Sequence, residues 1–176
     1  AEHLLERGKN KEAGLLREYV QQMQWNDATN REGHAAKVYF NALFGMDFSR
    51  SQDCPINAAL NYGYSLILSA VNREIVTNGY ITQLGLFHDN MFNQFNLGSD
   101  LMEPFRVLVD RKVFDMTLIE FEHEEKMQLV NLLNEEVIMD GKHYVILNAI
   151  KQYVKSVFDA LNESDIAQLS FYSYEL

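Results

Sequence analysis

Apolar side chains recur along this 176-residue chain at the three- to four-residue spacing of amphipathic helices. The spacing first occurs over residues 3–25, where the apolar positions are Leu4, Leu5, Leu15, Leu16, Tyr19, Val20 and Met23. No segment alternates apolar and polar residues for long enough to require a strand. The pattern therefore predicts an all-α fold, which we interpret as a single helical domain over residues 1–176.

Turn and capping residues divide the rest of the pattern into further helices. Residues 29–32 match a capping box that opens a helix, and Gly45 ends that helix. Pro55 suits the first position of the next long helix, which is expected to end at the Asn78-Gly79 pair. Further helices are expected to begin at Ser99 or Asp100, at the capping-box pattern of residues 117–120, and at His143 beyond a turn at Asp140-Gly141.

Composition narrows the class of protein. The length is sufficient for a single buried core. The one cysteine, Cys54, excludes an intramolecular disulfide and gives no zinc-type spacing. The chain has no run of about 18 apolar residues that could span a membrane, and its first residues lack a signal-peptide pattern. These features predict a soluble, cytoplasmic protein with no membrane partner.

The charge of the chain at first argues against a nucleic-acid partner. The formal net charge is −10, whereas binding to phosphates requires a basic surface. The excess is uneven, because residues 117–176 carry four basic and eleven acidic side chains and so contribute −7 of the −10. We interpret this last third as a solvated acidic helical face, with a surface for a basic partner as the rarer alternative.

Four residues offer ligands for a hard metal ion: Glu32, His88, Asp100 and Glu103. Asp100 and Glu103 are three apart on an expected helix and therefore share a face. Carboxylates with one imidazole suit Mg²⁺ or Mn²⁺, and such a cation can activate a phosphodiester. Each residue also has a purely structural explanation, since Glu32 completes a capping box, His88 could be a surface residue, and acids are stabilised near a helix N-terminus.

Two other interpretations remain open on the residues alone. Glu120-x-x-His123 has the spacing of half a di-iron carboxylate bundle, and Asp140-x-x-His143 loosely repeats it. The chain could also be a non-catalytic helical module for protein interaction, in which the acids only cap helices. If the partner is DNA, the best-placed phosphate contacts are Arg50, Arg106 and Arg111, and Tyr62 is a candidate for stacking on a base.

Longer strings of residues favour one family. Residues 53–88 read DCPINAALNYGYSLILSAVNREIVTNGYITQLGLFH, residues 99–113 read SDLMEPFRVLVDRKV, and residues 30–45 read NREGHAAKVYFNALFG. In order and spacing these strings resemble the CRISPR-associated integrase family, whose pattern is a Pro-x-Asn-x-x-x-Asn-Tyr-Gly-Tyr helix, a loop ending in His, and an Asp-Leu-x-Glu-Pro-Phe-Arg helix. The match covers residues 29–116. The sequences of the matching segments are most similar to those of type II systems, subtype II-A in particular.

The resemblance implies roles for residues of this chain. The metal-binding glutamate of the family falls on Glu32, the histidine on His88 and the second metal-binding acid on Glu103. Asp100 falls on an accessory acid, and Arg106 on a basic position that faces DNA. The implied catalytic set is therefore Glu32, His88, Glu103 and Asp100, with Mg²⁺ or Mn²⁺ as the cofactor.

The resemblance also implies an activity and partners. The activity is that of a DNA integrase and endonuclease, which inserts captured fragments (spacers) into a CRISPR array by transesterification with a free 3′-OH. The implied partners are double-stranded prespacer and repeat DNA, a second copy of the chain, and a small ferredoxin-like subunit. Type II systems add a ring-shaped DNA-end-binding protein and the effector nuclease. Members of the family carry an N-terminal β-rich domain, so this chain is expected to be the C-terminal catalytic domain, with residues 117–176 as its last helices.

Overall fold

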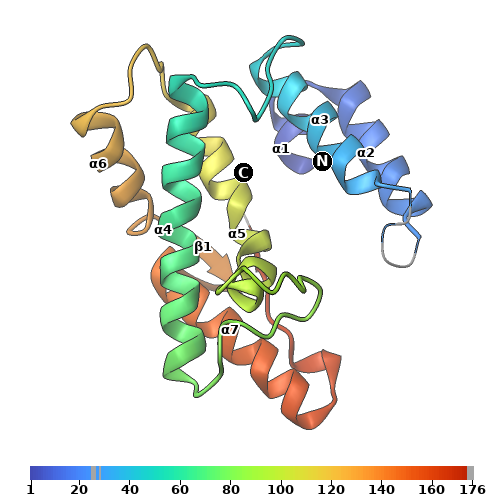
Figure 1. Cartoon of the computed structure of the whole chain (residues 1–176), viewed down its shortest axis with the longest axis vertical. Helices are drawn as coiled ribbons and strands as arrows, with labels where there is room; N and C mark the ends of the chain where they lie inside the picture. The colour runs from blue at the N-terminus through green and yellow to red at the C-terminus, as the bar shows by residue number, and fades with distance from the viewer. Residues whose placement is uncertain (25–26, 28, 174–176) are drawn as a thin grey trace. The chain divides into compact units, whose positions relative to one another are not determined.

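A computed structural model describes residues 1–24, 27 and 29–173 of the chain (Figure 1). Over these residues the fold is mainly helical, with seven α-helices and one small three-stranded sheet. The predicted helical class is therefore confirmed, although the sheet was not expected. The chain forms two compact units, Ala1–Asn57 and Ala58–Leu176. Within the described residues, no helix is both long and apolar enough to cross a membrane.

The first unit contains α1 (Glu2–Glu6), α2 (Asn10–Gln22) and α3 (Arg31–Phe44). The single helix predicted over residues 3–25 is wrong, because the chain turns at Gly8, whose φ of 71° favours glycine. The predicted end of that helix at residue 25 lies outside the described residues. Gly45 follows α3 as predicted, with φ 104°.

The start of α3 is capped differently from the prediction. The capping box predicted over residues 29–32 does not form: Asn30 is in the left-handed region and its side chain makes no cap bond. Instead, the carboxylate of Asp27 accepts the backbone N–H groups of Arg31 (2.7 Å) and Glu32 (3.0 Å). These are two of the N–H groups that a helix start leaves without a helical partner. Capping therefore does not explain the Glu32 side chain, which is exposed in the first turn of α3.

Two long helices form the frame of the second unit. α4 (Pro55–Thr77) begins and ends where the sequence predicted. α5 (Asn96–Asp115) approaches it closely at Gly63 and Gly98. The close approach needs glycine at position 63, because a Cβ there would overlap the side chain of Val109. α5 begins earlier than the predicted Ser99 or Asp100, so Pro104 lies inside the helix rather than in its first turn. α5 carries Asp100, Glu103 and Arg106.

The end of the chain differs most from the prediction. α6 (His123–Leu132) begins after a capping box of Glu122 and Glu125, not at residues 117–120. It is followed by β1 (Glu136–Met139) and β2 (Lys142–Val145), which pair antiparallel around the predicted Asp140-Gly141 turn. α7 therefore spans Ile146–Glu163 instead of starting at His143. A 3₁₀ turn (Ile166–Gln168) leads to β3 (Tyr172–Ser173), which pairs with the other edge of β1.

Candidate active site

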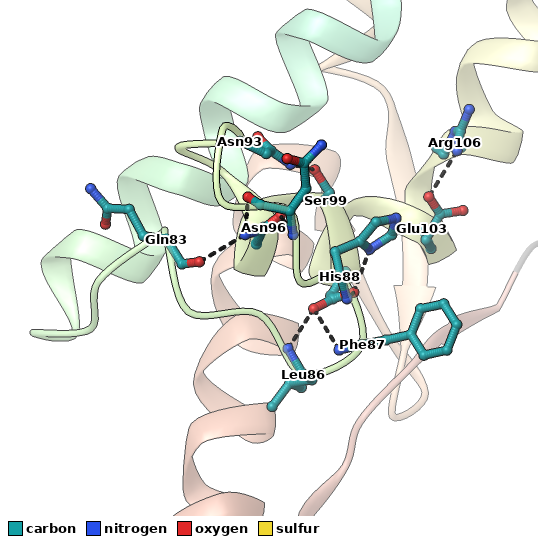
Figure 2. Close-up of polar contacts among 11 residues, drawn as sticks. Gln83, Leu86, Phe87, His88, Asn93, Asn96, Ser99, Glu103 and Arg106 are labelled. Carbon is teal, nitrogen blue, oxygen red and sulfur yellow. Dashed lines mark hydrogen bonds and ion pairs between the residues drawn. The ribbon is translucent and has the colours of Figure 1, made fainter. Parts of the chain in front are cut away.

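The segment between α4 and α5 has little regular structure, but side-chain hydrogen bonds hold it in place (Figure 2). The hydroxyl of Thr82 donates to the carbonyl of Gln94 (2.7 Å), while the carbonyl of Thr82 accepts the N–H of Leu97 (2.9 Å). The buried amide of Asn96 donates to the carbonyls of Gln83 and Asn90, both at 3.0 Å. This loop, residues 80–95, is therefore fixed to the start of α5.

The carboxylate of Asp100 holds the end of this loop in place through hydrogen bonds. Its Oδ2 accepts the N–H groups of Leu86 (2.6 Å) and Phe87 (3.1 Å), and its Oδ1 accepts the N–H of His88 (3.1 Å). Its Oδ1 also lies 2.6 Å from Nδ1 of His88. Each carboxylate oxygen thus has two donors, and the side chain is only 8% exposed. Asp100 therefore fixes both the backbone and the imidazole at position 88.

A glycine permits this arrangement. A Cβ added at Gly85 would overlap the carbonyl oxygen of His88 and would lie 2.8 Å from Oδ2 of Asp100. No side chain can therefore occupy position 85 while the loop and the carboxylate keep their places. Sequence reasoning overlooked Gly85 and Asn96, because a loop without periodicity gives no signal about which of its residues must be small or polar.

Electrostatics keep the Asp100 carboxylate ionised. Burial alone would raise its pKa, but the hydrogen bond from His88 and those from the three backbone N–H groups outweigh burial, so the pKa of Asp100 is lowered. An ionised carboxylate only accepts, so Nδ1 of His88 carries a proton, and in the neutral imidazole this tautomer leaves the lone pair on Nε2. A carboxylate that holds one ring nitrogen of a histidine while the other faces outward is the usual support of a metal-binding imidazole. The His88 side chain is 42% exposed and therefore accessible.

Glu103 follows Asp100 by three residues on α5, so both lie on one face of the helix. Its carboxylate accepts a hydrogen bond of 2.8 Å from Nη1 of Arg106 (Figure 2). The Arg106 guanidinium lies 4.5 Å from the centre of the Tyr64 ring. Burial opposes the charge on Arg106, but Glu103, Tyr64 and Asp110 outweigh it, and the pKa of Arg106 is raised.

The remaining predicted site residues have the following surroundings. In the first unit, Glu32 is exposed at the start of α3, and the guanidinium of Arg50 donates to the side chain of Asn57 and lies 5.5 Å from the centre of the Phe40 ring. In the second unit, Tyr62 is half-buried and meets the ring of Phe121 edge to face at 5.7 Å. DNA contacts of Arg50, Arg106 and Tyr62 stay predictions.

Within the predicted metal set, the structure shows one direct contact, that between His88 and Asp100. His88 and Glu103, with Asp100 behind the imidazole, belong to the second unit, and Glu32 belongs to the first. Among the described residues, no three His, Cys, Asp or Glu side chains converge on one point. One imidazole and one carboxylate are the donor types that Mn²⁺ and Mg²⁺ accept, so the second unit supplies two fitting ligands and needs a third.

The structure does not show the helical spacing that the di-iron interpretation requires. Glu120 precedes α6, and His123 is the first residue of that helix. Asp140 lies in the hairpin turn with φ 52°, and His143 lies on β2. Neither Glu120-x-x-His123 nor Asp140-x-x-His143 therefore places two ligands on one helical face.

Comparisons with known proteins agree with the family resemblance. The family model described as CRISPR associated protein Cas1 matches residues 3–136. The CRISPR-associated endonuclease Cas1 of Neisseria meningitidis is 34% identical over 169 residues, which cover 93% of this chain and 56% of the relative. The CRISPR-associated endonuclease Cas1 1 of Thermus thermophilus is 34% identical over 149 residues, which cover 76% of this chain and 47% of the relative.

The fold also has a solved counterpart. A casposase bound to integration product superimposes with a TM-score of 0.65 over 80% of this chain and 48% of the casposase chain, at 24% sequence identity. The chain spans about half the length of the relatives that it matches. The subtype II-A assignment stays a prediction. Because the family model covers most of the chain and a relative at 34% identity matches nearly all of it, the chain belongs to the Cas1 family of CRISPR-associated proteins.

Proposed function

We propose that this chain is the catalytic domain of a metal-dependent DNA integrase and endonuclease that inserts captured DNA fragments into a CRISPR array. The observation that carries the proposal is the His88–Asp100 pair, with Glu103 one turn further along α5, in a chain of the Cas1 family. The relatives at 34% identity are named endonucleases, which is consistent with cleavage of phosphodiesters by this chain.

Each residue has a separate role in this proposal. Nε2 of His88 and the carboxylate of Glu103 would hold Mg²⁺ or Mn²⁺, and Glu32 would supply a further carboxylate. Asp100 is a positioning residue, because it fixes the tautomer and direction of the imidazole through its bond to Nδ1. When bound, the cation supplies Lewis-acid stabilisation of the charge that develops on the phosphate and on the leaving oxygen.

The reaction proposed is a transesterification. The 3′-OH of the captured fragment loses its proton to water and forms a new P–O bond at the edge of a repeat. The bond from phosphorus to the 3′ oxygen of the cut strand breaks, and this oxygen takes up a proton from water to become a new 3′-OH. The number of phosphodiesters is unchanged, so neither ATP nor a covalent enzyme intermediate is needed. Water in place of the 3′-OH gives the endonuclease reaction at the same residues.

Substrate and partners follow from the same proposal. Double-stranded prespacer and repeat DNA would meet Arg50, Arg106 and Tyr62, whereas the acidic residues 117–176 face solvent or a protein. The complex would contain a second copy of the chain, a small ferredoxin-like subunit and the N-terminal β-rich domain of the family. A type II complex would add the DNA-end-binding ring and the effector nuclease.

Strand transfer in Mn²⁺ or Mg²⁺ tests the function. The assay contains the partner subunit and the N-terminal domain, and it compares the natural sequence with His88→Ala, Glu103→Ala and Glu32→Ala. His143→Ala is the matched control, because His143 also pairs with a carboxylate, that of Glu136. We expect metal-dependent joining that the first three substitutions abolish and the control leaves intact.

Two outcomes would contradict the proposal. Joining that survives His88→Ala and Glu103→Ala would make both residues structural and would remove the site. Absence of any joining or cleavage, with normal folding and assembly with the partner subunit, would favour the non-catalytic interaction module.

A further inference from the structure

The Glu103 carboxylate already has a cationic partner on its own helix. Nη1 of Arg106 donates to Oε1 of Glu103 at 2.8 Å, one turn along α5. The pair is only partly open to solvent, with the Arg106 side chain 36% exposed and that of Glu103 45% exposed. One oxygen of the carboxylate is therefore occupied by the guanidinium.

A second set of contacts holds the guanidinium in place. The Tyr64 ring, on α4, lies under Arg106 at 4.5 Å, which is within the range of a cation–π interaction. The Tyr64 hydroxyl donates to the carboxylate of Asp110, one further turn along α5, and both residues are buried. The negative charge of Asp110 strengthens the attraction of the ring for a cation. The contacts with Tyr64 and Glu103 therefore fix the position of the Arg106 guanidinium.

We propose that Arg106 is a built-in counter-ion of Glu103, held by Tyr64 and Asp110, that directs the carboxylate and weakens its affinity for a divalent cation. The inference rests on the proposed function, since it assigns to Glu103 the role of metal ligand. It adds Arg106 to the positioning residues of the site, beside the DNA contact proposed above.

The direction in which loss of Arg106 changes metal affinity distinguishes a counter-ion from a structural support and from a DNA contact. A guanidinium on one oxygen of the carboxylate repels a divalent cation on the other, so loss of its charge should tighten metal binding. Because both side chains are partly exposed, solvent screens the repulsion, and we expect a change of roughly three- to tenfold in Kd. A purely structural support would act oppositely, since its loss would disorder Glu103 and weaken binding. A pure DNA contact would leave metal binding unchanged.

The test is a titration of the full chain with Mn²⁺ alone, in which the signal of free Mn²⁺ is followed by electron paramagnetic resonance without DNA. Arg106→Gln should bind Mn²⁺ roughly three- to tenfold more tightly than the natural sequence. Arg106→Lys keeps the charge and should remain close to the natural sequence. Lys112→Gln removes a cation from the same helix that pairs with Glu135 at 2.6 Å, and it should change nothing.

Further variants separate failure of this inference from failure of the function. Equal or weaker Mn²⁺ binding by Arg106→Gln, with the natural sequence binding Mn²⁺ in a His88-dependent manner, would overturn the counter-ion role and leave the function intact. Absence of His88-dependent binding in both proteins would overturn both proposals. Tyr64→Phe keeps the ring and loses the bond to Asp110, so it should tighten binding less than Arg106→Gln. Thermal unfolding of each variant shows whether the fold is retained.

Discussion

Among the described residues of the second unit, two histidine–carboxylate pairs differ in distance, exposure and hydrogen bonding. Nδ1 of His88 lies 2.6 Å from Asp100, whose side chain is 8% exposed and also accepts three backbone N–H groups. Nδ1 of His143 lies 3.5 Å from Glu136 on the neighbouring strand, and both side chains are 67% exposed. The first pair joins the loop of residues 80–95 to α5, whereas the second lies on the surface.

The difference between the two pairs shows which structural feature indicates a metal-binding histidine. An exposed ion pair adds little to stability and leaves its imidazole free to rotate. A buried carboxylate with two donors on each oxygen directs its imidazole in one orientation, which a metal ligand requires. Spacing along the sequence does not distinguish the two cases, because Asp140-x-x-His143 suggested a ligand pair and the actual partner of His143 is Glu136.

The largest contrast is expected between His88→Ala and His143→Ala in strand transfer. Removal of a metal ligand should lower the rate by about a thousandfold or more, since the Lewis-acid stabilisation is lost. Removal of His143 should change the rate less than about twofold, because an exposed pair is weakly coupled to its surroundings. Rates measured at saturating Mn²⁺ with both variants check this. Similar losses in the two variants would show that the difference between the pairs is not functional.

Asp100→Asn should have the next largest effect. An amide would place an N–H₂ group against donors that now meet a carboxylate oxygen, so two of the four hydrogen bonds would be lost. We expect a loss of roughly 10- to 100-fold in Mn²⁺ affinity, the usual cost of removing a partner that orients a metal-binding histidine. Glu136→Gln is the control and should leave the affinity unchanged. Mn²⁺ titration of the two variants measures the contrast, and an Asp100→Asn affinity like that of the natural sequence would contradict it.

Gly85→Ala tests the loop without changing any charged group. The new Cβ would overlap the His88 carbonyl and approach Oδ2 of Asp100, so the loop must shift. We expect about 1–3 kcal/mol less stability and weaker Mn²⁺ binding, as for other overpacked positions. Gly14→Ala on α2, where a Cβ meets nothing within 4 Å, should be neutral or stabilising. Urea unfolding of both variants gives the difference, and an unchanged Gly85→Ala protein would mean that the loop is loose.

Acid should weaken the His88–Asp100 pair. The pKa of Asp100 is lower in the folded chain than the ordinary value of 3.8, so its contribution to stability is present above that value and is lost as the pH falls through the folded pKa. The free energy of unfolding should therefore fall less between pH 5 and pH 3 in Asp100→Asn than in the natural sequence. Equal falls in the two proteins, measured by urea unfolding, would show that Asp100 does not carry this dependence.

The sequence predicted those features that depend on strong local signals. Pro55 and Asn78-Gly79 bounded α4 correctly, and Gly45 ended α3, because these residues have few alternatives in conformation. The cap of α3 came from Asp27, and the hairpin strands are only four residues each, too short for alternation to be distinguished from chance.

The candidate site was predictable in its residue types but not in its assembly. His88, Asp100 and Glu103 were named from donor chemistry and from the family strings. The role of Asp100 depends on three N–H groups of a loop that lies 12 to 14 residues earlier in the chain, and such contacts leave no periodic trace. Tyr64 and Asp110 are 46 residues apart, and only the packing of α4 on α5 brings them together.

The smallest expected effect concerns Tyr172, which links the regions of the two pairs. Its backbone pairs with Met139 on β1, beside the hairpin of His143, and its hydroxyl donates to the Pro104 carbonyl of α5 at 2.6 Å. Tyr172→Phe should cost about 0.5–1.5 kcal/mol, the net value of one hydrogen bond. Tyr144→Phe on β2 is the control, since no hydrogen bond of that hydroxyl occurs among the described residues. Because the Asp100 contacts remain intact, Mn²⁺ affinity should not change in Tyr172→Phe, and a loss of affinity would show that the C-terminal strand also supports the His88 pair.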